Sequence, residues 1–214
     1  MNASRRPRRA ALIAVEGIDG MGKSTQVAAL VDRLNRAGRP ALATREPTQG
    51  PWGRKIRGLA LEGRGEVSPE DELDWFLRDR MEHVEAVIRP ALRAGKIVVT
   101  DRYYFSTMAY QGALGIDPQR IREMNEALFP RPDLVILLRG DPRLGLARIA
   151  RNRERGADAG YEQAVYLDRV ATLFAGFRDP SLRVIDARGS LEEVAERIWA
   201  AVEPLLESLE RAAE

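Results

Sequence analysis

One stretch near the amino end of the chain constrains the fold more than any other. Residues 17–25 read Gly-Ile-Asp-Gly-Met-Gly-Lys-Ser-Thr, with an apolar run before them at 11–15 and an amphipathic run after them at 26–34. This order predicts a strand, a glycine-rich loop and a helix. Glycines let such a loop turn several N–H groups inward, and the following helix directs its positive end at the same point. The spacing of the glycines from the Lys-Ser pair is that of a loop that cradles phosphate groups.

The residue types in this loop predict a nucleoside triphosphate with Mg²⁺ as its ligand. Lys23 is placed to reach the β- and γ-phosphates, and the Ser24 hydroxyl is placed to bind the metal ion. The alternative, a glycine turn without a ligand, is disfavoured because spacing, lysine, hydroxyl and strand–helix context all agree. The loop alone does not say what is phosphorylated. The residues predicted to bind ATP are Gly17, Ile18, Asp19, Gly20, Met21, Gly22, Lys23, Ser24 and Thr25.

Length and composition favour a single α/β domain over residues 10–214. The chain has 214 residues, of which 44% are hydrophobic, and this is enough for one sizeable core. It has no cysteine, so disulfides and thiolate metal sites are excluded, and we expect a cytoplasmic protein. The net charge of +2 gives no reason to expect nucleic acid as a partner, and no apolar run approaches the ~20 residues of a membrane span. Residues 1–9 are predicted to be a disordered basic leader, with a targeting or nucleic-acid role as the alternative.

Strand and helix patterns alternate along the chain, which predicts a five-stranded parallel sheet flanked by helices. After the strand at 11–15, apolar runs predict strands at 40–44, 96–102, 133–138 and 182–187. A long helix is predicted to begin at Pro69 and to be kinked or restarted at Pro90. Residues 103–112 are predicted to be a helix or a loop, and residues 153–160 a charged loop. The other helices are predicted at 23–37, 52–61, 117–129, 141–151, 161–177 and 190–209.

An acid and a base, Asp101 and Arg102, follow the buried strand at 96–100. In open α/β sheets, ligands bind at the carboxyl ends of the strands. Asp101 is therefore predicted to act on Mg²⁺ or on an attacking oxygen, and Arg102 to clamp an acceptor phosphate with two hydrogen bonds. The alternative is a plain salt bridge at the end of a strand.

A second group of basic residues indicates a lid at about 148–160. Arg148, Arg151 and Arg155 fall on one helical face, and Arg153 lies beside them in a segment that contains two glycines. Phosphoryl transfer needs positive charge that closes over the transferred group. The alternative is a solvated charged face, since Glu154 is interspersed.

A third group of residues is suited to a nucleobase. Phe76 and Arg80 are one helical turn apart, and aromatic and polar side chains follow Arg102. A ring can stack on a base while guanidinium and amide groups bond its edge. The alternative for Phe76 and Tyr110 is a place in the core, and His83, the chain's single histidine, is expected to be a partly buried helix residue. The group comprises Phe76, Arg80, Arg102, Ser106, Thr107, Tyr110 and Gln111.

The run from Val99 to Gln111 resembles the signature of thymidylate kinases. The order of the other pieces is similar to that family too: residues 16–25, then 44–47, then Phe76 with Arg80, then the arginine lid. The resemblance covers nearly the whole chain after the leader. It implies the P-loop nucleoside monophosphate kinase fold with a short Arg-rich lid, the ATP-dependent phosphorylation of dTMP to dTDP, and a homodimer.

The resemblance also implies a role for each matching residue. Lys23 and Ser24 would hold the phosphates and Mg²⁺, with Asp101 as the second metal ligand. Arg153 and Arg155 would act with Lys23, Asp101 and Arg102 as the catalytic set, because Gly20 stands where some members carry a catalytic arginine. The implied dTMP contacts are Asp19 with the sugar 3′-hydroxyl, Arg45 and Arg102 with the phosphate, Phe76 and Arg80 with the base, Thr107 and Gln111 with the base edge, and Tyr110 at the 2′ position.

The chain departs from the family pattern at residues 48–53, which read Thr-Gln-Gly-Pro-Trp-Gly where many members have a paired-glycine turn followed by an acidic residue, and at residues 156–160 of the lid. Three other functions stay open at this point. The nearest is a kinase of another nucleoside monophosphate. The others are a nucleotide-dependent switch without an acceptor, and a nucleic-acid ATPase that uses the basic leader.

Overall fold

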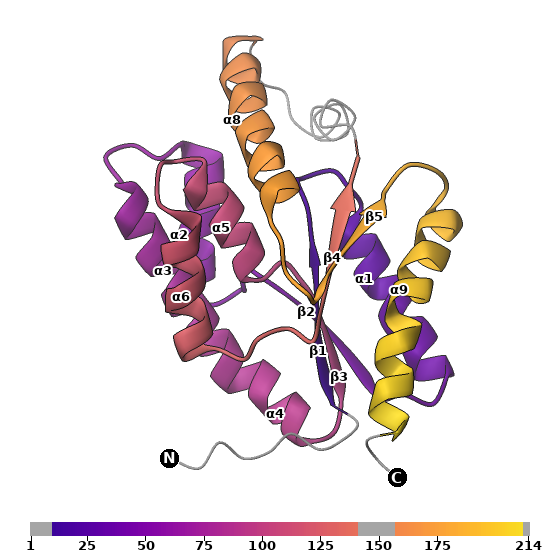
Figure 1. The fold of residues 1–214 in the computed structure, drawn as a ribbon. Helices are drawn as coiled ribbons and strands as arrows, with labels where there is room; N and C mark the ends of the chain where they lie inside the picture. Colours follow the sequence, from indigo (N-terminus) through magenta and orange to yellow (C-terminus); the bar gives the residue numbers. More distant parts are fainter. Residues whose placement is uncertain (1–9, 141–156, 212–214) are drawn as a thin grey trace.

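The computed structural model describes residues 10–140 and 157–211, which form a parallel sheet with helices on both faces (Figure 1). The sheet has five strands in the order β2-β3-β1-β4-β5, and every neighbouring pair is parallel, so the predicted sheet is confirmed. The leader, the helix predicted at 141–151 and the lid arginines 148, 151, 153 and 155 lie outside the described residues. The strands are β1 (Ala11–Glu16), β2 (Ala41–Arg45), β3 (Ile97–Asp101), β4 (Leu134–Arg139) and β5 (Leu182–Asp186).

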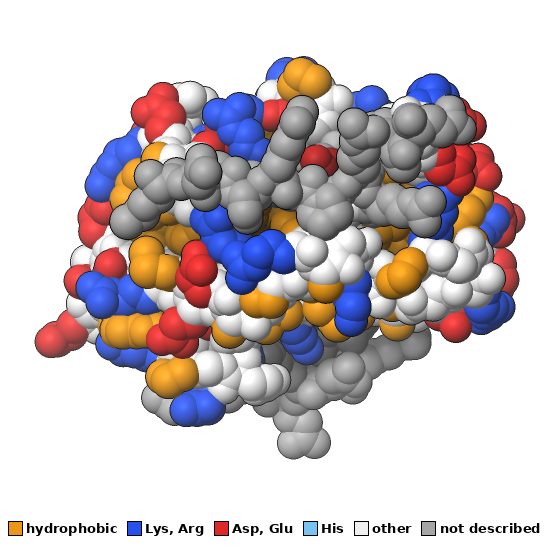
Figure 2. Space-filling model, turned by 90° about the horizontal axis from the view of Figure 1, so that it is seen from below, with side chains coloured by type: hydrophobic (Ala, Val, Ile, Leu, Met, Phe, Trp, Pro, Cys, Tyr) orange, Lys and Arg blue, Asp and Glu red, His pale blue; other side chains and the backbone are white. Residues whose placement is uncertain are grey.

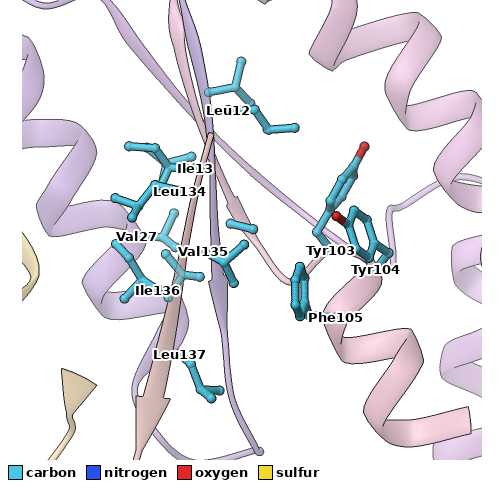
Figure 3. Close-up of a cluster of buried hydrophobic side chains, with 14 of the residues drawn as sticks. Leu12, Ile13, Val27, Tyr103, Tyr104, Phe105, Leu134, Val135, Ile136 and Leu137 are labelled. Atoms are coloured by element: carbon cyan, nitrogen blue, oxygen red, sulfur yellow. The ribbon is translucent and has the colours of Figure 1, made fainter. Parts of the chain in front are cut away.

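The central strands are apolar because helices cover them on both sides. Every residue of β1 and β3 is buried, as expected for the middle of a parallel sheet. Figure 3 shows Val27 on one side of these strands and the aromatic run from Tyr103 to Phe105 on the other. In register, Val15 of β1 and Arg45 of β2 both lie beside Asp101 of β3. The carboxyl ends of these three strands therefore meet at one edge of the sheet.

Helices form a layer on each face of the sheet (Figure 1). α1 (Lys23–Arg36) packs against α9 (Leu191–Arg211) on one side. The layer on the other side of the sheet includes α5 (Tyr104–Gly112) and α8 (Ala157–Gly176), which pack against each other. None of the described helices is both long and apolar enough to cross a membrane. The remaining α-helices of the described residues are α2 (Pro51–Glu62), α3 (Pro69–His83), α4 (Arg89–Arg93) and α6 (Pro118–Leu128).

Short polar signals explain several helix ends. The Ser68 hydroxyl accepts the Asp71 N–H at the start of α3. A capping box precedes α9, with the Ser190 N–H bonded to Glu193 at 2.8 Å. Gly38 follows α1 with a φ of 72°, the left-handed conformation that favours glycine at this place.

Three helical segments refine or correct the prediction. A π-helical turn, η1 (Val84–Ile88), joins α3 to α4 and puts Pro90 in the first turn of α4, where its missing N–H is tolerated. The prediction of a loop up to residue 160 was wrong at its end, because α8 begins at Ala157. Gly160 costs a helix only about 1 kcal/mol, while the alanines around it favour one. Residues 104–112 form α5, which settles the choice between helix and loop.

Figure 2 shows the end of the molecule that lies opposite the carboxyl ends of the strands. Basic and acidic side chains of the described residues are interspersed there, with apolar side chains between them. Such a mixed surface is ordinary for a protein with balanced charge.

Candidate active site

The glycine loop leaves β1 and enters α1 by a tight path. Gly17 has a φ of 135°, and a Cβ there would lie 2.5 Å from the Leu138 carbonyl oxygen of β4. Gly20 and Gly22 also have left-handed φ values, of 81° and 83°. Only glycine adopts these conformations without strain. α1 begins at Lys23 with no side-chain cap, so its amino end is available to an anion.

The Lys23 side chain folds back over this loop. Its Nζ donates to the Ile18 carbonyl at 2.8 Å and lies 4.0 Å from Asp19 Oδ1. Burial, assisted by the nearby Arg102 charge, lowers the pKa of Lys23 to about 8. An anion bound in the loop would remove this penalty on the ammonium form.

Ser24 and Asp101 meet, as the sequence predicted for a metal site. The Ser24 hydroxyl donates to Asp101 Oδ2 at 2.5 Å. Among the described residues, the other oxygen of this carboxylate, Oδ1, is buried without a hydrogen-bond partner. Carboxylate and hydroxyl oxygens are ligands that Mg²⁺ prefers, and this ion takes few protein ligands when phosphates supply the rest. The pair therefore fits a magnesium ion.

Arg102 holds the centre of the site. Its φ of 73° is left-handed, which is rare for a residue other than glycine and typical of functional positions. The guanidinium donates to Asp19 at 2.6 Å, to Ser106 at 2.9 Å and to the Tyr110 hydroxyl at 3.2 Å. The Arg102 charge, helped by Lys23 and opposed by burial, lowers the pKa of Asp19 to about 2. Lys23, Asp19, Arg102 and Tyr110 are thus brought together.

Glu16 stabilises this arrangement through Ser106, which contacts Arg102. Glu16 was given no role by sequence reasoning. It is fully buried at the end of β1, where it accepts the Tyr103 N–H at 2.8 Å and the Ser106 hydroxyl. Burial raises the pKa of Glu16 to about 7, although the Ser106 hydrogen bond and Arg102 oppose the shift. Ser106 links Glu16 to Arg102 and so fixes the guanidinium.

Arg80 lies in the core of the protein, with its side chain 1% exposed. Its Nε and Nη2 donate to Glu46 Oε2 at 2.9 and 2.6 Å, its Nη2 also donates to Thr107 at 3.0 Å, and its Nη1 donates to Asn125 at 2.5 Å. A guanidinium has five N–H donors, so these four bonds leave one Nη1–H. Arg80 and Thr107 are brought together, and the direction of that last donor is fixed.

His83 was expected to be only partly buried, and that expectation was wrong. Its exposed fraction is 4%, and its ring bonds the Thr44 hydroxyl at 2.6 Å and Glu46 Oε1 at 2.9 Å. Although burial disfavours its charge, Arg80 and His83 hold the pKa of Glu46 below its ordinary value. Glu46 thus ties α3 to the end of β2 through a residue that sequence reasoning did not single out.

α3 and α5 face each other with two polar cross-links. Glu72, Phe76 and Arg80 share one face of α3, and Thr107 and Gln111 share one face of α5. Arg80 contacts Thr107, and Glu72 Oε1 accepts the Gln111 amide at 3.1 Å. Phe76 lies between these links, half-buried and outside the cluster of core side chains. Among the described residues, the Gln111 Oε1 atom is buried with no partner.

Comparison with known proteins identifies the family. A family model described as thymidylate kinase matches residues 15–198. The chain belongs to the thymidylate kinase family. It is 45% identical to a thymidylate kinase of Xanthomonas campestris over 192 residues, which cover 89% of this chain and 82% of the relative. It is also 44% identical over 195 residues to relatives from Desulfotalea psychrophila and Archaeoglobus fulgidus, named thymidylate kinase and probable thymidylate kinase. Each alignment covers 91% of this chain, together with 95% of the Desulfotalea protein and 96% of the Archaeoglobus protein.

The structure places Arg45 among the expected thymidylate kinase site residues but does not describe the two lid arginines. Arg45 is exposed at the carboxyl end of β2, level with Asp101. Arg153 and Arg155 lie outside the described residues. The residues missed from sequence are Glu16, Glu46, Glu72 and Asn125, each a polar residue beside a predicted site residue in space. One signal was present, since Glu72 lies one helical turn before Phe76 on the same face.

Proposed function

We propose that this protein transfers the γ-phosphoryl group of ATP to dTMP and yields dTDP and ADP. The observation that carries the proposal is the polar pair that flanks Phe76. Arg80 has one directed N–H donor left, and Gln111 has a buried acceptor oxygen. Thymine offers the complement of this pair, a carbonyl oxygen beside an N–H group. A half-buried phenyl ring between them suits stacking on the flat base.

The phosphate side of dTMP is assigned to Arg102. Its bonds to Asp19, Ser106 and Tyr110 use three N–H donors of the five in a guanidinium, which leaves two for a phosphate. We assign Asp19 to the sugar 3′-hydroxyl and Tyr110 to the space beside the 2′ carbon, because both side chains contact Arg102. Arg45 is a proposed second contact of the phosphate, because it lies at the same edge of the sheet.

ATP is assigned to the loop from Gly17 to Thr25 and to the amino end of α1. Ser24 and Asp101 would hold Mg²⁺, which neutralises charge on the β- and γ-phosphates when bound. A dTMP phosphate oxygen attacks the γ-phosphorus, and the bond from this phosphorus to the β–γ bridging oxygen breaks in line. The attacking oxygen already carries charge, so no strong base is needed. Lys23 and Arg102 stabilise the transferring group, and Arg153 and Arg155 are proposed to complete this task from the lid.

The localisation, oligomeric state, cofactors and domain organisation of the enzyme are further proposals. We propose a cytoplasmic homodimer that uses ATP and Mg²⁺, with a single kinase domain from residue 10. The balanced charge of the chain supports small-molecule substrates rather than nucleic acid. Size-exclusion chromatography with light scattering tests the dimer.

Steady-state kinetics with purified protein, ATP and Mg²⁺ test the substrate. We expect kcat/KM for dTMP to exceed that for dCMP by at least about a hundredfold, since cytosine presents an amino group to Arg80 and lacks the N3–H. Equal turnover of the two, or none of either, would contradict the proposal. Phosphate release without an acceptor would instead support a nucleotide switch.

A variant of Phe76 tests the base site. We expect Phe76→Ala to raise KM for dTMP at least about fivefold and to leave KM for ATP unchanged, because stacking on a base contributes about 1–3 kcal/mol. The matched control is Trp75→Ala, which removes the neighbouring half-buried ring that contacts Lys55 instead. Equal effects of the two variants on KM for dTMP would place the base elsewhere.

A further inference from the structure

We infer that Glu72 is a positioning residue that sets the base specificity of the site by fixing which way the Gln111 amide faces. This inference rests on the proposed function. An amide side chain can present either an acceptor oxygen or a donor NH₂ group to a ligand. Which group faces a base decides whether bases with or without an N3–H are accepted.

The Gln111 amide has one orientation that its surroundings allow. Its Nε2 donates to Glu72 Oε1 at 3.1 Å, and both side chains are buried. A carboxylate only accepts hydrogen bonds, so an inverted amide would bring two oxygens together at that distance. The NH₂ group therefore stays on Glu72, and Oε1 is turned away from it.

Glu72 is itself held in place by hydrogen bonds to both of its carboxylate oxygens. Its second oxygen, Oε2, accepts the Arg64 Nε–H at 2.9 Å. Arg64 in turn donates to the Tyr166 hydroxyl at 3.1 Å, and that hydroxyl donates to the Tyr110 carbonyl at 3.0 Å. These bonds connect the segment before α3 to α8 and α5. The carboxylate thus has a fixed cation on one side and a fixed amide on the other.

The Gln111 oxygen that faces away from Glu72 is suited to accept a hydrogen bond from a ligand. Among the described residues, Gln111 Oε1 is buried without a partner. Buried acceptors are nearly always bonded in folded proteins, so a ligand N–H at this place has a clear physical role. Gln111 lies one helical turn from Thr107, which contacts Arg80. Pyrimidines that carry an N3–H, namely thymine and uracil, fit an acceptor here, and cytosine does not.

The variant Glu72→Gln tests this inference, because it keeps the shape of the side chain but can donate as well as accept. The Gln111 amide then loses its preferred direction. We expect the ratio of kcat/KM for dTMP to that for dCMP to fall at least about tenfold. The fall should come from a higher KM for dTMP with kcat within about threefold of wild type, since the base is remote from the reacting phosphates. KM for ATP should not change.

Glu70→Gln is the matched control, since it makes the same change two residues earlier in α3. Glu70 is exposed and pairs with Arg120 at 2.6 Å. This control should keep the wild-type ratio. A Glu72→Gln protein that also keeps the ratio would overturn the inference while the proposed function stands. A wild-type protein that does not prefer dTMP would overturn the proposed function itself.

A measurement on the wild-type protein decides the matter if Glu72→Gln does not fold. In protein labelled with ¹⁵N-glutamine, the Gln111 side-chain signal can be assigned by its loss in Gln111→Leu. We expect the amide proton that is bonded to Glu72 Oε1 to be protected from solvent exchange both before and after dTMP is added, because this hydrogen bond is kept. Free exchange, or loss of protection when dTMP binds, would show that the amide turns and would overturn the inference.

Discussion

At the scale of single residues, the charge of Lys23 depends on what lies in the glycine loop. Its Nζ is buried beside the Ile18 carbonyl, and burial together with Arg102 lowers its pKa to about 8. For a base, a lowered pKa means that the neutral form is favoured in the folded protein. Close to pH 8, about half of the molecules therefore carry a neutral Lys23 until phosphate groups arrive.

We expect ATP binding to take up a proton at pH 8. The phosphates raise the pKa of Lys23, so roughly half a proton enters for each ATP bound, and the uptake vanishes near pH 6.5, where Lys23 is already charged. Isothermal titration calorimetry in buffers of different ionisation enthalpy measures this uptake. Lys23→Arg, which is charged at every working pH, is the control and should show none. Equal uptake by both proteins would assign the proton to another group.

The spacing of residues within one helix predicted part of the site, and contacts between distant segments supplied the rest. Phe76 and Arg80 share a face because they are four residues apart, and the sequence is enough to see this. The partners of Arg80, namely Glu46 and Asn125, lie 34 and 45 residues away. No local pattern marks such pairs, since a lone acid or amide on a helix or at a strand end is usually solvated. They become visible only when the fold places them in the core.

At the scale of elements, apolar runs predicted all five strands, because a strand buried on both faces has few polar alternatives. The π-helical turn from Val84 to Ile88 was not predicted, because such turns are rare and no residue pattern in the sequence marks this one. The start of α8 was misplaced because one glycine in its first turn costs a helix only about 1 kcal/mol.

Helix α2 carries a glycine whose importance comes from packing. Gly53 is the third residue of α2, where a glycine by itself weakens a helix. In the fold, a Cβ at Gly53 would lie 2.0 Å from the Thr48 carbonyl oxygen, so α2 touches the segment that follows Glu46. That segment is also held by Asp79, which accepts the Thr48 N–H at 2.9 Å.

We expect Gly53→Ala to displace the segment from Glu46 to Gly50. The melting temperature should fall, and KM for dTMP should rise several-fold because Glu46 orients Arg80, while KM for ATP is unchanged. Gly58→Ala is the control on the same helix, with nothing within 4 Å of the added Cβ. It should be neutral or stabilise the protein by up to about 1 kcal/mol. A Gly53→Ala protein as stable as Gly58→Ala would mean that the contact with Thr48 relaxes freely.

At the scale of the whole molecule, Glu16 affects both the geometry of the site and the stability of the fold. This carboxyl lies at the end of the central strand β1 and bonds both Tyr103 and Ser106. Burial raises its pKa from 4.5 to about 7. A raised carboxyl pKa means that the folded protein binds the proton more tightly than the unfolded chain does. The contribution of Glu16 to stability is therefore fully present below pH 4.5 and is lost as the pH rises through 7.

The variant Glu16→Gln should remove this pH dependence, because its amide resembles the protonated acid in shape and charge. The unfolding free energy of wild type relative to Glu16→Gln should fall by about 3 kcal/mol between pH 4.5 and pH 8, from a shift of about 2.5 pKa units. Asp19 and Lys23 contribute with the opposite sign, but Asp19 changes below pH 4 and Lys23 mainly above pH 8. Urea unfolding at several pH values measures the difference, in which groups common to both proteins cancel. A difference that does not change with pH would show that Glu16 stays ionised, with Arg102 and Ser106 compensating fully for its burial.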